Sequence, residues 1–147
     1  MLNEIYRKVQ NEKSQSINLL RDIVNIESFS GSKSNVDNLS KFLSEKCETM
    51  GGKNKFYPQK DFGDNFTSDF YSGDETVVIL CHMDTVWPIG TLQERPFTIE
   101  GNIAKGPGVF DMKVGITITL EAIRILNELG FTPKTNIKLL LNSEYFF

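Results

Sequence analysis

Histidine, tryptophan and cysteine are scarce in this chain, so few imidazole and thiol groups are present for metal binding or disulfide bonds. Its 147 residues include one histidine, one tryptophan and two cysteines. Cys47 and Cys81 are far apart and have apolar neighbours, so free core thiols are expected in preference to a disulfide. Lysine and arginine form no cluster, and a net charge of -3 gives no attraction for a phosphate backbone. A nucleic-acid partner is therefore not expected.

Long apolar runs are also missing. No stretch approaches the ~20 apolar residues that span a bilayer. Residues 1–15 alternate charged and apolar side chains, unlike a secretory signal peptide. The overall content of 39% hydrophobic and 24% charged residues is typical of a soluble globular domain. We therefore expect a cytoplasmic protein without a membrane partner.

The first half of the chain is predicted to be mainly helical. Apolar residues recur at intervals of three and four in residues 5–24 and again in residues 36–50, which places them on one helical face. This spacing predicts two helices before the loop at residues 28–32 and one helix after it. Residues 55–73 mix aromatic residues with Gly, Asp and Asn, and are predicted to form short strands or loops.

The second half shows a strand, helix, strand pattern. Residues 76–81 are an unbroken β-favouring run, typical of a strand buried on both faces. Residues 97–99 and 103–104 predict a hairpin. Residues 112–129 predict a long helix that is apolar on most sides, and residues 137–141 predict a second core strand. Because a long crossover helix joins strands that run parallel, the predicted fold class is α/β.

Two side chains that could bind a metal follow the first core strand. In sheets of this kind ligands bind beyond the carboxyl ends of the strands, where His82 and Asp84 lie. Asp84 could accept the imidazole N–H and fix which ring nitrogen faces outward, as a metal-bound histidine requires. The alternative is a histidine that is satisfied by a nearby carboxylate and binds nothing.

A second candidate lies where the long helix is expected to begin. Residues 106–113 read Gly-Pro-Gly-Val-Phe-Asp-Met-Lys, and the two glycines and the proline indicate a tight turn before Asp111. Aspartate at a helix start is most simply an N-cap that satisfies backbone donors. The turn is more elaborate than a cap requires, so a functional carboxylate remains the alternative interpretation.

Taken together, these segments resemble the zinc metallopeptidase family of glutamate carboxypeptidases, aminoacylases, acetylornithine deacetylases and succinyl-diaminopimelate desuccinylases. The resemblance is carried by His-Met-Asp-Thr-Val at 82–86 and by the glycine-rich turn, with Asp111 placed 29 residues after His82. Parts of residues 87–102 look closest to the glutamate carboxypeptidase branch. Residues 26–31 are similar to the family's early loop.

The resemblance implies a fold and a metal site. The fold would be a partial three-layer α/β sandwich with a mixed, largely parallel sheet. The site would hold two Zn²⁺ ions that share a carboxylate and a water. By position, His82 matches a ligand of one zinc, Asp84 matches the catalytic acidic residue that supports this histidine, and Asp111 matches the carboxylate that bridges both metals. A cis peptide between Asp111 and Met112 would accompany that site.

The resemblance also implies an activity, which is hydrolysis of an amide bond with release of a C-terminal or N-acylated amino acid. The metals would lower the pKa of the bound water and polarise the scissile carbonyl. A glutamate would carry the proton to the leaving amine. The substrate would be a small peptide or an N-acyl amino acid. The alternatives are an N-acyl amino acid deacylase, or a non-catalytic remnant or interaction domain that keeps the fold.

The sequence departs from the family pattern after residue 141. Asn142 and Ser143 match it, and Glu144 occupies the first of three acidic positions. Tyr145 stands where the resemblance implies the proton-shuttling glutamate, and Phe146 stands where it implies a zinc-binding glutamate. A milder departure is Val114, where glycine is usual.

These departures lead to an expectation about the chain as a whole. Residues 1–147 are expected to be the N-terminal portion of the catalytic domain, without its C-terminal half and without the dimerisation domain. Since zinc sites generally need three or four protein ligands, His82 and Asp111 alone would not suffice, and the chain by itself is expected to be inactive. A dimer is expected only in a longer form. The strand that ends at Leu141 is expected to expose an unpaired, aggregation-prone edge.

Overall fold

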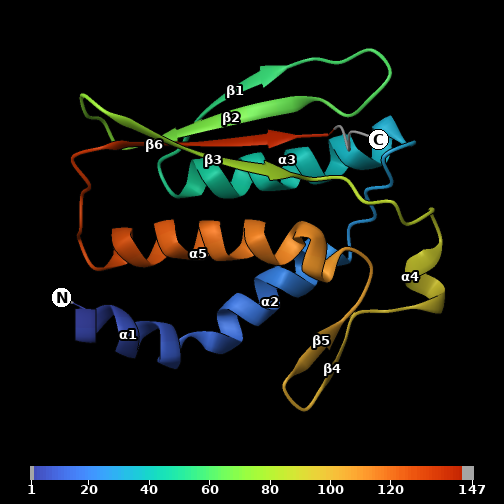
Figure 1. Ribbon diagram of the computed structural model, residues 1–147, viewed down its shortest axis with the longest axis horizontal. Coiled ribbons are helices and arrows are strands. Elements are labelled where there is room, and N and C mark those ends of the chain that lie inside the picture. Colours follow the sequence, from blue (N-terminus) through green and yellow to red (C-terminus); the bar gives the residue numbers. More distant parts are fainter. Residues whose placement is uncertain (1, 144–147) are drawn as a thin grey trace.

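A four-stranded sheet lies along one side of the molecule, and helices pack beneath it (Figure 1). This computed structural model describes residues 2–143. The helices in this range are α1 (Leu2–Asn11), α2 (Lys13–Val24), α3 (Lys33–Thr49), α4 (Thr91–Glu94) and α5 (Val114–Glu128). The strands are β1 (Lys53–Tyr57), β2 (Asn65–Phe70), β3 (Thr76–His82), β4 (Thr98–Glu100), β5 (Ile103–Lys105) and β6 (Asn136–Asn142).

The main sheet has the strand order β1-β2-β6-β3 and is mixed. Strands β3 and β6 run parallel, as expected for two strands that α5 connects. The pairs β1–β2 and β2–β6 are antiparallel. The α/β class and the mixed sheet are therefore confirmed. The parallel part is smaller than expected because β1 and β2 follow one another through a short loop, which favours an antiparallel pair.

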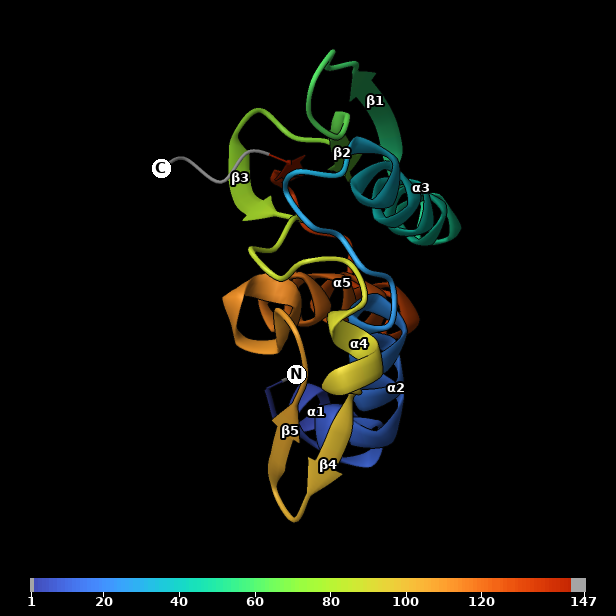
Figure 2. The same cartoon turned by 90° about the vertical axis from the view of Figure 1, so that its right-hand side faces the viewer.

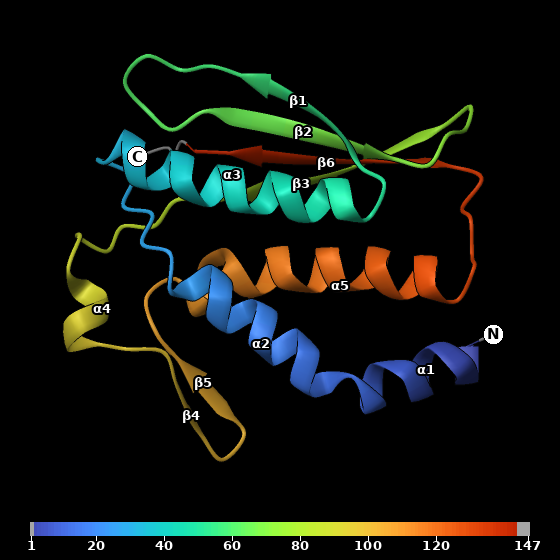
Figure 3. The same cartoon turned by 180° about the vertical axis from the view of Figure 1, so that it is seen from behind.

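The helices form two layers on the same side of this sheet. Figures 1 and 3 show α3 and α5 next to the sheet and α1 and α2 beyond α5, and Figure 2 shows the same order after a 90° turn. The core fills the space between the sheet and the first helix layer. Its buried residues are Ile23, Val36, Leu39, Leu43, Cys47, Phe66, Phe70, Cys81, Met83, Ile116, Leu120, Ile123, Leu139 and Leu141.

Strand β3 departs most from its prediction. Its outer edge pairs with no strand of residues 2–143, and Val77, Val78 and Leu80 are 54%, 56% and 64% exposed. Burial on both faces was therefore the wrong prediction for this strand. The unpaired edge also belongs to β3 and not to β6, which lies between β2 and β3. An apolar run indicates that a strand prefers to be buried. Which strand lies at the edge of the sheet depends on its pairing with strands far away in the sequence.

The remaining predicted elements are present with small shifts. The hairpin pairs β4 with β5, and the long helix begins at Val114 and not at residue 112. It ends before Gly130, whose φ of 66° is the left-handed conformation that glycine adopts readily. Within residues 2–143, no helix has the length and apolar character needed to cross a membrane.

An ionic cluster joins the N-terminal helices to α5. The Arg124 guanidinium donates to Glu121 at 2.9 Å, to Glu12 at 2.8 Å and to Glu128 at 2.7 Å. The Lys8 ammonium adds contacts to Glu12 and Glu128. The Arg124 and Glu121 side chains are only 13% and 9% exposed, so this part of the cluster is poorly screened by solvent.

We expect Arg124→Met to lower the free energy of unfolding by ~2–3 kcal/mol, because it leaves the buried Glu121 carboxylate without its cation. Denaturant titration followed by circular dichroism measures this loss. The matched control is Lys105→Met, since the Lys105–Glu100 pair is 54% and 64% exposed and should be worth less than ~1 kcal/mol. Equal losses in the two variants would contradict a structural role for the cluster.

Both cysteines are free and buried, as predicted. Burial raises the pKa of the Cys47 thiol to about 12 and also raises the pKa of Cys81. Because the thiolate is the reactive form, neither thiol of the folded protein should react with a disulfide reagent at mildly alkaline pH. Both should react in concentrated guanidinium chloride. A Lys60→Cys variant, with an exposed thiol, should react at once and is the positive control.

Candidate metal centre

His82 is the last residue of β3 and lies beside Asn142 at the end of the parallel partner strand β6. The chain beyond it is held on both sides. The Met83 N–H donates to the Asn142 carbonyl at 2.8 Å, and the Thr85 N–H donates to the Ser28 carbonyl at 2.7 Å. His82 therefore lies at the carboxyl end of adjacent parallel strands, where the sequence predicted it.

The glycine-rich turn brings the second candidate to this place. Gly108 has a φ of 71°, and a Cβ on it would lie 2.5 Å from the Thr85 side chain, so only glycine fits here. Lys113 is 2% exposed, and its ammonium donates to the carbonyls of Ile23 at 3.1 Å and Ile26 at 2.7 Å. These contacts fix the turn against the strand end on one side and against the end of α2 on the other.

Asp111 is not the N-cap of α5. It lies in a kinked turn, Val109–Lys113, where its φ and ψ of -123° and 98° are non-helical, and α5 begins only after Lys113. The N-cap interpretation is therefore wrong, because the extra turn separates the aspartate from the helix start. The Asp111–Met112 peptide is cis, as the resemblance implied.

The structure brings the two candidate residues together. The distance between His82 Nε2 and Asp111 Oδ1 is 3.0 Å, although the residues are 29 positions apart. The His82 side chain is 16% exposed and that of Asp111 is 60% exposed. Both line a pocket of about 270 Å³. An imidazole nitrogen and a carboxylate oxygen thus meet at the lip of one cavity.

The second ring nitrogen of His82, Nδ1, faces Asp84, two residues later in the chain. Nδ1 lies 3.0 Å from the Asp84 carbonyl oxygen and 3.5 Å from the Asp84 carboxylate. The sequence predicted the carboxylate as the nearest partner, whereas the backbone carbonyl is closer. The Asp84 carboxylate, followed by that of Asp111, raises the pKa of His82 to about 9 against the opposing effect of burial.

The donors at this lip fit part of a metal site. Neutral imidazole nitrogen and carboxylate oxygen are both zinc ligands, and the nitrogen that would carry the metal is the one opposite the Asp84 contacts. The Asp84 Oδ1 atom is buried without a hydrogen bond, which fits a carboxylate reserved for a cationic partner. Among residues 2–143, however, no group of three metal-ligating side chains gathers. The predictions for Glu144, Tyr145 and Phe146 lie outside the described residues.

Three side chains near the site were not predicted from the sequence. Lys113 holds the turn, and Ser30 donates to the Asp84 carboxylate at 2.5 Å. The Glu27 carboxylate accepts the N–H groups of Gly90 and Leu92 and so fixes the loop beside the pocket. The resemblance of residues 26–31 to an early family loop was the available signal, but it assigned no role to these side chains.

Comparisons with known proteins show which proteins this chain is similar to. The family described as Peptidase family M20/M25/M40 matches residues 78–144, which include both candidate metal ligands. Carboxypeptidase G2 from Pseudomonas sp. (strain RS-16) is 28% identical over 145 residues, covering 97% of this chain and 35% of that protein. Part of this chain, residues 78–144, is thus similar to the M20/M25/M40 peptidases.

Solved structures share the fold of this chain. Human carnosine dipeptidase 1 superposes with a TM-score of 0.86 at 16% identity, over 97% of this chain and 34% of that protein. An M20 family metallo-carboxypeptidase from Sulfolobus solfataricus superposes with a TM-score of 0.74 at 23% identity, over 88% of this chain and 30% of that protein. The chain spans about a third of the length of the relatives that it matches.

Proposed function

We propose that this chain is the N-terminal portion of the catalytic domain of a zinc-dependent hydrolase that cleaves an amide bond. The observation that carries the proposal is the 3.0 Å approach of His82 Nε2 to Asp111 Oδ1 at the pocket lip. Two such donors converge from distant segments, and each is held by its own set of backbone contacts. The match of residues 78–144 to a peptidase family supports the reaction class.

Each residue has a distinct part in this proposal. His82 Nε2 and an Asp111 carboxylate oxygen would hold zinc, with Asp111 as the proposed shared carboxylate. Asp84 orients the imidazole from the Nδ1 side. Bound zinc supplies a water of lowered pKa and polarises the substrate carbonyl. Lys113 and Gly108 keep the Asp111 turn in place without contacting the reacting atoms.

The proposed substrate is a small peptide or an N-acyl amino acid, with a C-terminal glutamate as the first candidate for the released residue. Similarity to Carboxypeptidase G2 supports a carboxypeptidase in preference to an N-acyl amino acid deacylase. The pocket beside His82 has apolar walls that include Val86, Trp87 and Phe110, which suit an apolar part of the substrate. Phe110 is 90% exposed and available for such a contact.

We also propose that these 147 residues do not catalyse the reaction alone. Tyr145 and Phe146 carry no carboxylate at the positions where the resemblance implies the proton shuttle and a further ligand. Neither a phenol nor a benzyl group replaces a carboxylate in zinc binding, because both lack an anionic oxygen near neutral pH.

Zinc binding in a chelator competition tests the proposal. Because two described ligands are fewer than a zinc site generally needs, we expect binding that is weak but above that of a protein without a metal site, and no hydrolysis of N-acyl amino acids or γ-glutamyl amides. Absence of any zinc binding would favour a remnant that keeps the fold without the metal chemistry. Hydrolysis by the chain would overturn the proposed inactivity and support the reaction class.

A further inference from the structure

The Asp84 carboxylate is buried and has few partners. Its side chain is 0% exposed. Among residues 2–143, the only hydrogen bond that it accepts comes from the Ser30 hydroxyl, to Oδ2 at 2.5 Å. The other oxygen, Oδ1, lies 3.5 Å from His82 Nδ1. A buried anion held by one donor depends strongly on that donor for its orientation.

The Ser30 hydroxyl has two acceptors within reach, and the carboxylate is the favoured one. The Thr85 carbonyl oxygen lies 3.0 Å from Ser30 Oγ, whereas Asp84 Oδ2 lies 2.5 Å away. The Thr85 carbonyl already accepts the Ser30 backbone N–H at 2.9 Å. Because a charged acceptor makes the shorter and stronger bond, the single hydroxyl proton points to the carboxylate.

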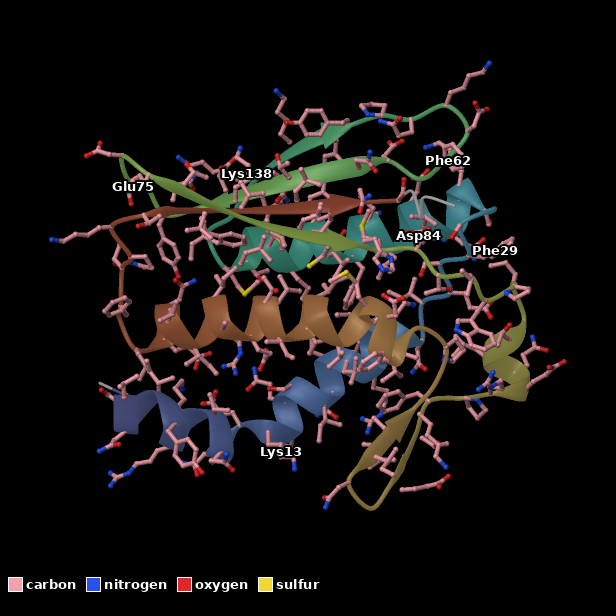
Figure 4. The ribbon with its side chains drawn as sticks, viewed as in Figure 1. Lys13, Phe29, Phe62, Glu75, Asp84 and Lys138 are labelled. Carbon is pink, nitrogen blue, oxygen red and sulfur yellow. The ribbon has the colours of Figure 1, made fainter. Side chains whose placement is uncertain are left out.

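Ser30 is itself held in place from both sides. Phe29 and Thr85 form a parallel β-bridge, and the Thr85 N–H donates to the Ser28 carbonyl. The loop after α2 therefore runs alongside the segment after β3, and Figure 4 shows Asp84 and Phe29 at the same end of the sheet. A donor on so constrained a backbone can fix a partner side chain in one orientation.

We propose that Ser30 is a positioning residue that acts through Asp84 on the His82 imidazole. Its hydroxyl fixes Oδ2 and leaves the Oδ1 atom 3.5 Å from Nδ1. This charge adds to the Asp84 carbonyl oxygen, which lies 3.0 Å from Nδ1, and the two together hold the ring with Nε2 toward Asp111. The proposed effect of Ser30 on zinc binding rests on the proposed function. Its effect on the orientation of the His82 ring does not.

The matched pair Ser30→Ala and Ser28→Ala separates positioning from general packing. Ser28 lies in the same loop and is 1% exposed, but its hydroxyl donates to the Met83 backbone carbonyl at 2.9 Å. Both variants lose one hydroxyl, and only Ser30→Ala loses a bond to the Asp84 side chain. Since His82 is the only histidine, its imidazole signals in NMR spectra need no assignment by mutation.

The first measurement is exchange of the His82 Nδ1–H with water in the metal-free protein. We expect exchange to be about tenfold faster in Ser30→Ala, the scale of one hydrogen bond to a charged group, and unchanged in Ser28→Ala. Unchanged exchange in Ser30→Ala, or equal acceleration in both variants, would overturn the proposal. If Ser30→Ala does not fold, Ser30→Cys replaces it, because the thiol has a similar shape and is a weaker hydrogen-bond donor. The same exchange rates then decide the outcome.

The second measurement is zinc affinity, by competition with a chromophoric chelator. We expect a ~10–100-fold loss in Ser30→Ala, as for other outer partners of a metal ligand, and no loss in Ser28→Ala. If wild-type zinc binding leaves the His82 signals unchanged, the metal centre itself is wrong, and the exchange measurement still decides the role of Ser30.

Discussion

Asp111→Asn is expected to lower the affinity for zinc by more than the ~10–100-fold that loss of an outer partner costs, because it removes the charge of the proposed direct ligand. His82→Ala should have an equal or larger effect, since it removes the only imidazole of the chain. Both losses are measured by competition with a chelator. The fold should persist, because neither side chain belongs to the buried core.

Asp74→Asn is the control for these variants. Asp74 is exposed and lies just before β3, at the opposite end of the strand from His82. It loses the same charge, so any shared effect would report the net charge of the protein and not the site. Zinc affinities of Asp111→Asn and His82→Ala that match the wild type would place the metal elsewhere.

The second large effect concerns the free edge of β3. We expect the wild-type chain to self-associate through this edge at micromolar concentration, with a second copy of the chain as the partner. Strand β3 carries no acidic residue, lysine, arginine or proline, and Val78 and Leu80 are both more than half exposed. Edges of this kind lack the charges that keep natural sheets apart. Residues 76–81 carry no charged side chain, so two copies of this part of the edge do not repel one another.

Val78→Lys should convert the associated species to a monomer, as measured by sedimentation velocity. The matched control is Ile103→Lys, because Ile103 is 62% exposed but lies on the separate β4–β5 hairpin. A monomeric wild type with a cooperative melt would contradict the expected association. Equal effects of the two lysines would show that total exposed apolar surface, and not the β3 edge, drives it.

Local patterns in the sequence were sufficient for most elements and for the meeting of His82 with Asp111. Apolar periodicity predicted the helices, and the strand, helix, strand order predicted the parallel pair. That pair brings its carboxyl ends together and so places His82 beside the sheet end. The glycine-rich turn was one further candidate segment, and the family resemblance implied that its Asp111 shares a site with His82.

The failures share a physical cause, which is that local sequence does not encode distant partners. An aspartate before a helix gives the same local signal whether it is an N-cap or lies in a kinked turn, so position alone favoured the cap interpretation of Asp111, which the structure contradicts. The nearest acceptor for His82 is a backbone carbonyl, while the Asp84 carboxylate is engaged by Ser30, 54 positions earlier. The exposure of β3 likewise depends on which strand pairs outermost.

The most direct test of the central claim is the long-range ¹H–¹⁵N spectrum of the single histidine, recorded before and after zinc is added. If His82 and Asp111 hold the metal, the Nε2 signal moves to the position of a metal-bound nitrogen while Nδ1 keeps its proton. Signals of His82 that do not change on zinc addition, or binding through Nδ1, would contradict the account.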